Sequence, residues 1–204
     1  MKKLKIEMVL DLTCSWCPIG YKYITTALKN LDLTDEDVDF KFLPFQLNPE
    51  MSNDGELIND NLKRKTGQND EQLKLYRENL LNVAKECEVE FDFDKRTHYF
   101  NTFQGHVLIN LAQKKHLQQD IYKILCDTYY KNGKRFTDDY VINKVADKLK
   151  LPKEHIFNLF SQQSTKKEIS KKESYVKLLG INSVPTFIIN DTNLIRGSNS
   201  VDFF

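Results

Sequence analysis

The sequence has no apolar run near the ~20 residues needed to span a bilayer, so it predicts no membrane-spanning helix. It also has no excess of either charge, because 30 Lys and Arg residues face 29 Asp and Glu residues. A net charge of +1 gives no electrostatic reason to expect nucleic acid or an anionic membrane as a partner. The hydrophobic content of 40% is that of an ordinary globular protein, and 204 residues are enough to bury a sizeable core.

The N-terminal stretch MKKLKIEMVLDL opens with basic residues, as a secretory signal does. Its apolar part, however, is interrupted by Glu7 and Asp11, and no small-residue cleavage site follows. We therefore expect a cytoplasmic protein.

Cysteine is scarce, with four residues in the chain, too few for a disulfide scaffold. Cys87 and Cys126 lie among apolar residues at helical spacing, and we expect both to be small buried hydrophobic side chains. Cys14 and Cys17 differ from them, because they form a C-x-x-C motif directly after an apolar run and before a helix-like stretch.

The order of elements places this motif at a junction between a strand and a helix. Residues 2–12 are apolar enough for a buried strand, residues 19–31 carry apolar side chains at steps of four, and residues 37–47 alternate as a strand does. A strand, a helix and a strand at this spacing form a βαβ unit, so we predict that its two strands are parallel.

The middle and the end of the chain follow different patterns. From about residue 56 to residue 162, almost every segment is predicted to be helical. Near the end, a helix over 171–180 closes at Gly180, and two short apolar strands follow that are joined by a tight turn. We predict an α/β fold in which residues 1–55 and 163–204 form one discontinuous domain and residues 56–162 an inserted helical domain.

A working dithiol needs one stabilised and accessible thiolate, and a helix N-terminus favours an anion. Cys14 stands where the strand gives way to the helix, which fits the attacking thiol, and Cys17 is placed to resolve a mixed disulfide. A purely structural disulfide between them would close a tiny loop and stabilise little.

A zinc site is the other use of such a pair, and it needs two further ligands at short spacing. No second C-x-x-C motif is present, and the four histidines do not form an H-x₃₋₅-H pattern, so we expect no metal. These histidines are His98, His106, His116 and His155.

A C-x-x-C motif between the first strand and the first helix, with SVPT before a late strand, resembles the thioredoxin superfamily. The segments FLPFQLNPEM, NTFQGHVLINLA and GINSVPTFIINDTNLIRGSNSVDFF resemble the DsbA-like thioredoxin family, and within it the FrnE-type branch of oxidoreductases. The resemblance spans nearly the whole chain. It implies a thioredoxin fold with a large all-helical insertion between its βαβ and αββ halves.

The resemblance also implies roles for particular residues. Val184 and Pro185 match the family's X-cis-Pro pair, whose first residue leaves backbone groups free to bind an extended substrate. Thr186 is expected to hydrogen-bond near the thiols, and Ser15 is expected to lie at the substrate site. Trp16 either packs the floor of the site or contacts substrate.

Two features depart from the pattern of the branch. Ser15 stands where relatives carry proline, and Pro18 follows the motif instead. If Cys14 is the helix N-cap, Pro18 removes the first intrahelical hydrogen bond to the Cys14 carbonyl, which affects the helix start. Relatives also continue into a further helix beyond the segment that ends at Phe204, so we expect the last helix to be short, missing or trimmed.

The resemblance implies a thiol–disulfide oxidoreductase that acts on protein or small-molecule disulfides, as a monomer or homodimer. No flavin or nicotinamide motif is present, so we expect no resident cofactor and an external redox partner such as glutathione or thioredoxin. Two alternatives remain open. One is a glutathione-dependent isomerase or transferase of the kappa or 2-hydroxychromene-2-carboxylate isomerase type, which typically carries serine at the position of Cys14; the other is a non-catalytic partner-binding protein.

His106 lies in a helix that the resemblance places over the site. It is either a satisfied structural histidine or a catalytic residue.

Overall fold

The computed structural model describes residues 3–204. Its main sheet has four strands in the order β2-β1-β5-β6. β1 pairs with β2 in parallel, and β5 is antiparallel to both β1 and β6, which confirms the predicted parallel βαβ unit and the terminal antiparallel pair. The strands are β1 (Leu4–Leu10), β2 (Val38–Pro44), β5 (Thr186–Ile189) and β6 (Asn193–Arg196).

Side chains of β1 point alternately into two hydrophobic clusters, one on each face of the sheet. Met8 and Leu10 join the large cluster formed with α1 (Trp16–Asn30) and the helices of the middle segment. Val9 joins a smaller cluster with Val176 of α8 (Gln163–Leu178). This period of two buries both faces of β1, as its nearly continuous apolar sequence predicts.

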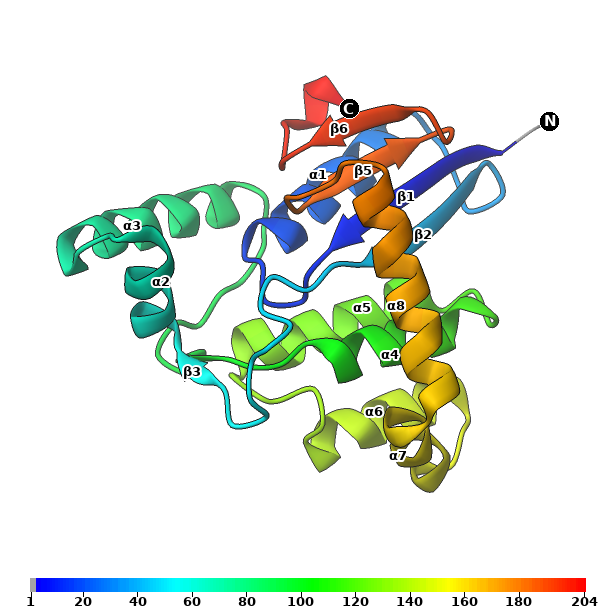
Figure 1. The fold of residues 1–204 in the computed structure, drawn as a ribbon. Coiled ribbons are helices and arrows are strands. Elements are labelled where there is room, and N and C mark those ends of the chain that lie inside the picture. Colours follow the sequence, from blue (N-terminus) through cyan, green and yellow to red (C-terminus); the bar gives the residue numbers. More distant parts are fainter. Residues whose placement is uncertain (1–2) are drawn as a thin grey trace.

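The middle segment is mainly helical; in Figure 1 its first two helices lie to the left of the sheet and the later ones below it. One pair of two-residue strands, β3 and β4, interrupts it, which the hydrophobic period did not indicate because two residues are too few to show alternation. The segment comprises β3 (Glu56–Leu57), α2 (Ile58–Thr66), α3 (Asp70–Glu86), β4 (His98–Tyr99), α4 (Phe103–Gln113), α5 (Gln118–Cys126), a π-helix η1 (Asp127–Lys131), α6 (Asp139–Leu149) and α7 (Lys153–Ser161).

The ends of the terminal elements also differ in detail from the sequence-based prediction. The last long helix, α8, begins at Gln163, well before residue 171, and Gly180 follows it with the left-handed φ of 69° expected of a C′ glycine. After β6 the chain forms only the short 3₁₀-helix η2 (Val201–Phe203). Phe204 packs its ring 4.9 Å from that of Phe187 in β5.

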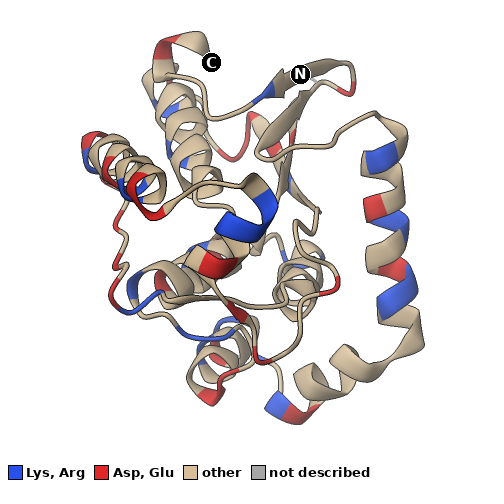
Figure 2. Cartoon of the chain, turned by 60° about the vertical axis from the view of Figure 1, so that its left-hand side comes forward, with Lys and Arg blue, Asp and Glu red and all other residues tan. Residues whose placement is uncertain are grey.

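Charged residues of both signs are interspersed along the chain, as Figure 2 shows. This mixture agrees with the net charge of +1. Within residues 3–204, no helix has the length and apolar character needed to cross a membrane.

Helix α4 approaches the end of β1 closely at Gly105. A Cβ atom at this position would overlap Leu12 Cδ1 and lie 3.2 Å from Phe136 Cγ. Both neighbours are buried, with exposed fractions of 1%, so neither side chain can move into solvent to make room. Glycine therefore allows the middle segment to pack against the chain just before the cysteine motif.

We expect Gly105→Ala to destabilise the protein by about 1–3 kcal/mol, because an added methyl group overpacks a filled core. Urea denaturation followed by far-UV circular dichroism measures this change. Gln104→Ala, on the same helix but partly exposed, is the control and should change stability by less than about 0.5 kcal/mol. Equal stability of Gly105→Ala and the wild type would show that Leu12 repacks without cost.

Candidate active site

Cys14 lies in the turn between β1 and α1. Helix α1 begins at Trp16 with Ser15 as its N-cap, so Cys14 is one residue outside the N-cap position considered from the sequence. The Cys14 carbonyl accepts the Cys17 N–H at 2.9 Å and the hydroxyl of Tyr130, also at 2.9 Å. A residue other than proline at position 18 could have donated its backbone N–H to the Cys14 carbonyl. The Tyr130 hydroxyl supplies a donor to this carbonyl instead.

The two thiols of the motif differ in accessibility. Cys14 retains 8% of its exposure, whereas Cys17 retains none, and neither cysteine forms a disulfide. Burial, together with a hydrogen bond to Cys14, raises the pKa of Cys17 well above the usual value for a thiol. Cys17 therefore keeps its proton near neutral pH.

Val184 lies against Cys14, and the peptide bond between Val184 and Pro185 is cis, the isomer that the resemblance implies. The Cys14 thiol donates a hydrogen bond to the Val184 carbonyl with an Sγ–O distance of 3.4 Å. Thr186 is fully buried, and its hydroxyl donates to the Ser183 carbonyl at 2.8 Å. This hydrogen bond holds the turn that precedes β5.

Trp16 and Ser15, between the cysteines, face the middle segment. The Trp16 ring is partly buried against the cluster of Ile19 and Leu80. Ser15 is 7% exposed and lines a pocket of about 320 Å³ together with Tyr76 and other residues of α2 and α3. Trp16 therefore packs the site, and Ser15 borders a cavity beside Cys14.

Asp11 is a member of the site that the sequence did not identify. It is 1% exposed, and its carboxylate accepts the Thr13 N–H at 2.8 Å, the Thr13 hydroxyl at 3.0 Å and the Leu47 N–H at 2.5 Å. Burial raises its pKa above the usual value for aspartate. The sequence feature that could have identified Asp11 is its position, a charged residue at the end of a buried strand and three positions before Cys14.

Arg96 is the second member that the sequence did not identify. Only 2% of it is exposed, and its Nη2 donates to the Thr13 carbonyl at 3.0 Å. The guanidinium lies within 6 Å of four aromatic rings. These rings belong to Phe93, Tyr99, Tyr129 and Tyr130. No local sequence pattern joins Arg96 to Thr13, because 83 positions separate them.

His106 lies on α4 with 3% exposure, and within residues 3–204 its Nε2 has no hydrogen-bond partner. Burial lowers its pKa to about 4, so the imidazole is neutral at physiological pH. A neutral, enclosed histidine fits a structural role better than proton transfer with solvent.

The other two cysteines lie away from the motif and differ in burial. Cys87 is buried, with 6% exposure, as the sequence predicts, whereas Cys126 is only partly buried against the core. Burial raises the pKa of both thiols, that of Cys126 to about 12. High pKa values keep these thiols protonated, which makes them poor nucleophiles.

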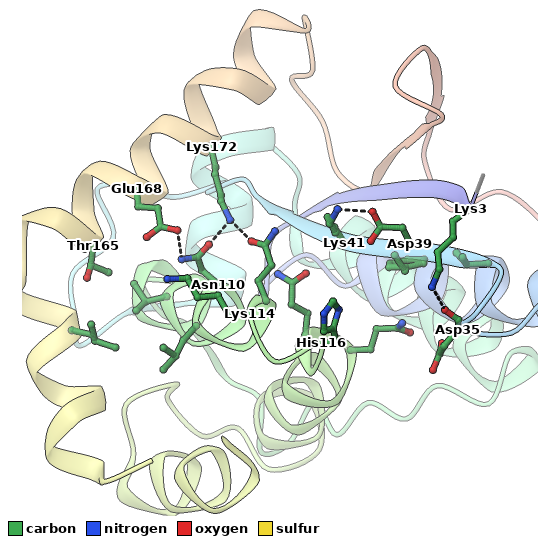
Figure 3. Close-up of a pocket in the computed structure, with 18 of the residues that line it drawn as sticks. Lys3, Asp35, Asp39, Lys41, Asn110, Lys114, His116, Thr165, Glu168 and Lys172 are labelled. Carbon is green, nitrogen blue, oxygen red and sulfur yellow. Dashed lines mark hydrogen bonds and ion pairs between the residues drawn. The ribbon is translucent and has the colours of Figure 1, made fainter. Parts of the chain in front are cut away.

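A larger pocket, of about 1250 Å³, lies elsewhere between β2, α4 and α8. Figure 3 shows its polar lining, in which Lys172 Nζ bonds the side-chain oxygens of Asn110 and Gln113. Neither the cysteine motif nor residues 184–186 line it. Among the described residues, no group of three His, Cys, Asp or Glu side chains could hold a metal ion.

The chain is similar to several known proteins over nearly its whole length. The uncharacterized protein YwbO of Bacillus subtilis (strain 168) is 22% identical over 202 residues, covering 98% of this chain and 92% of YwbO. The probable DsbA oxidoreductase SCO1869 of Streptomyces coelicolor superposes with a TM-score of 0.86 at 20% identity, over 98% of this chain and 86% of that one.

Two further structures share the fold at lower similarity. The cytosolic disulfide reductase DsbM of Pseudomonas aeruginosa, solved with GSH, has a TM-score of 0.65 at 14% identity, over 94% of this chain and 89% of that one. A 2-hydroxychromene-2-carboxylate isomerase has a TM-score of 0.65 at 11% identity, over 95% of this chain and 89% of that one. The family model that describes the DSBA-like thioredoxin domain matches residues 5–204, so the chain belongs to the DsbA-like thioredoxin family.

Proposed function

We propose that this protein is a thiol–disulfide oxidoreductase in which Cys14 attacks the substrate and Cys17 resolves the mixed disulfide. The observation that carries the proposal is the contrast within the motif. Cys14 stands at the start of α1 with part of its surface exposed, whereas Cys17 is enclosed beneath it. An accessible thiol at a helix start and a protonated, buried partner are the two parts that disulfide exchange needs.

The reaction proceeds in two exchanges. The Cys14 thiolate attacks one sulfur of a substrate disulfide, an S–S bond forms between them, and the other substrate sulfur leaves as a thiolate that takes a proton. Cys17 then loses its proton and attacks Cys14 Sγ, which releases the second substrate thiol. The protein dithiol loses two electrons and two protons, and the substrate disulfide gains them; the reverse sequence oxidises a substrate dithiol.

The substrate binds beside Val184 in this proposal. The Val184 carbonyl lies 3.4 Å from Cys14 Sγ, and the residue is partly exposed, so a backbone strand placed there brings its sulfur to Cys14. Ser15 and Pro185 flank the same site. Protein or small-molecule disulfides are both compatible with such backbone recognition.

An external thiol or disulfide, such as glutathione or thioredoxin, regenerates the pair in this proposal, and the reaction takes place in the cytoplasm. The fold shared with a cytosolic disulfide reductase agrees with that location.

Equilibration of the protein in a series of glutathione redox buffers tests the proposal. We expect one reversible two-electron transition, followed by thiol trapping and by Trp16 fluorescence. A midpoint near ≈ −270 mV would make the protein a reductant, and one near ≈ −120 mV an oxidant. Cys87→Ser, a matched change at an enclosed cysteine, should leave the transition unchanged. Absence of a reversible transition would contradict the proposal and favour glutathione-dependent isomerisation or partner binding.

A further inference from the structure

Arg96 is a buried cation in contact with the active-site turn. It lies between α3 and β4 with 2% exposure, and among residues 3–204 no carboxylate forms an ion pair with it. Aromatic faces stabilise a guanidinium, but an enclosed charge still costs free energy unless an anion compensates it. The groups that Arg96 contacts therefore indicate which anion its charge stabilises.

Arg96 contacts the turn that carries the Cys14 thiol. Arg96 Nη2 bonds the carbonyl of Thr13, the residue bonded directly to Cys14, at 3.0 Å. The same guanidinium lies 4.9 Å from the ring centre of Tyr130, whose hydroxyl bonds the Cys14 carbonyl at 2.9 Å. The two side chains thus hold two successive carbonyls of the active-site turn.

The π-helix η1 makes this arrangement possible. It directs two consecutive tyrosines into the core, where Tyr129 bonds the His98 carbonyl at 2.9 Å and Tyr130 bonds the Cys14 carbonyl. Both rings also cover the Arg96 guanidinium, at 4.8 and 4.9 Å. A π-helical turn inside a helix often marks a functional site, and here it aims two adjacent side chains at one cation.

We propose that Arg96, oriented by Tyr130, is a positioning residue that favours the thiolate form of Cys14. A fixed positive charge bonded to the residue before Cys14, in a water-poor environment, stabilises an anion at Cys14. Hydrogen bonds to the Thr13 and Cys14 carbonyls also occupy oxygens whose partial negative charge would oppose the thiolate. The inference rests on the proposed function, because it assigns a role to Arg96 in the chemistry of the same dithiol.

Several other titratable groups surround the pair and contribute to the same equilibrium. Burial raises the pKa of each of them, so the tyrosines and Cys17 are neutral near pH 7 and Asp11 is the one acidic group among them. They are Asp11, Cys17, Tyr76, Tyr99 and Tyr130. The test therefore changes the charge of Arg96 while leaving these groups in place.

The experiment measures the rate of Cys14 alkylation by iodoacetamide against pH, with the modified peptide identified by mass spectrometry. Arg96→Gln keeps a hydrogen-bond donor for Thr13 but removes the charge. We expect its pH profile to move up by about one unit, which lowers the rate about tenfold on the acidic side of the transition. Arg96→Lys keeps the charge and should restore most of the rate.

Arg77 provides the matched control. It also lies over the Phe93 ring, at 5.3 Å, and lines the same pocket, but it is partly exposed and bonds Asn59. Arg77→Gln should therefore retain the wild-type alkylation profile. Tyr130→Phe keeps the ring and loses only the hydroxyl, and we expect about a threefold reduction in rate in the same direction.

The glutathione equilibrium supplies a second measurement. Loss of thiolate stabilisation disfavours the reduced form of the protein. Arg96→Gln should therefore shift the equilibrium about tenfold toward the disulfide, which makes the reduction potential of the pair about 30 mV more negative. If folded Arg96→Gln keeps the wild-type profile and midpoint, the role of Arg96 is overturned while the oxidoreductase proposal stands. If the wild type shows no transition, the oxidoreductase proposal fails first. Should Arg96→Gln not fold, an unchanged profile in Tyr130→Phe would overturn the inference.

Discussion

Replacing Cys14 with serine is expected to lower the rate of disulfide exchange by at least about a thousandfold, the scale seen when an enzyme loses its nucleophile. A serine hydroxyl does not ionise near neutral pH, whereas a thiolate at a helix start attacks sulfur directly. Reduction of a small aromatic disulfide by the pre-reduced protein measures the rate. Cys87→Ser makes the same atomic change at an enclosed thiol and should keep the wild-type rate.

The matching change at Cys17 separates attack from resolution. Cys17→Ser should still form the mixed disulfide but not release it, so the protein accumulates with one half of the substrate attached. Intact-mass spectrometry detects this adduct, and cleavage into peptides places it on Cys14. An adduct on Cys17 in the Cys14→Ser variant would reverse the roles that we assign to the two thiols.

Acidification is expected to destabilise the protein through His106. Because the folded-state pKa is lowered to about 4 from 6.5, the unfolded chain binds a proton between these values that the folded chain does not. The contribution of neutral His106 to the free energy of unfolding is therefore fully present above pH 6.5 and is lost as the pH drops toward 4. A difference of about 2.5 pKa units corresponds to roughly 3 kcal/mol. Urea denaturation at several pH values measures the loss.

The comparison of two histidine variants isolates this effect. His106→Gln lacks the titrating group, so its stability should fall by roughly 3 kcal/mol less than that of the wild type between pH 7 and pH 4. His155→Gln changes an exposed histidine and should follow the wild type. Asp11, whose pKa burial raises, acts in the opposite direction, but it is present in each protein and cancels from the difference. Parallel curves for His106→Gln and the wild type would contradict the assignment.

The same variant also decides whether His106 takes part in catalysis. A structural histidine with a neutral ring predicts that His106→Gln retains the exchange rate at pH 7.5 within a few-fold. A loss on the scale of Cys14→Ser would instead make His106 a catalytic residue.

The elements that the sequence predicts well are those with a clear local period. The apolar run of β1, the alternation in β2 and the steps of four in α1 are set by which faces are buried, and each was recognisable within about ten residues. The cysteine motif was recognisable for the same reason, because its chemistry depends on spacing along the chain. The left-handed Gly180 likewise marked the end of α8.

The environment of the motif could not be predicted in this way, because its contacts join distant segments. Arg96 lies in an irregular stretch, and its aromatic neighbours are distributed from Phe93 to Tyr130. Pro18 raised a question about the start of α1 that no local pattern answers. The answer comes from a tyrosine hydroxyl 116 positions away, which bonds the Cys14 carbonyl.

The pairing of β1 with β5 has a consequence for synthesis on the ribosome. Met8 pairs with Phe187, so one edge of β1 remains without its partner until nearly the whole chain has been translated. At about 5–20 residues per second, this interval is roughly 10 to 40 s. An apolar strand with an open edge is prone to association during such an interval, and newly made chains should therefore depend on chaperones more than the folded protein does.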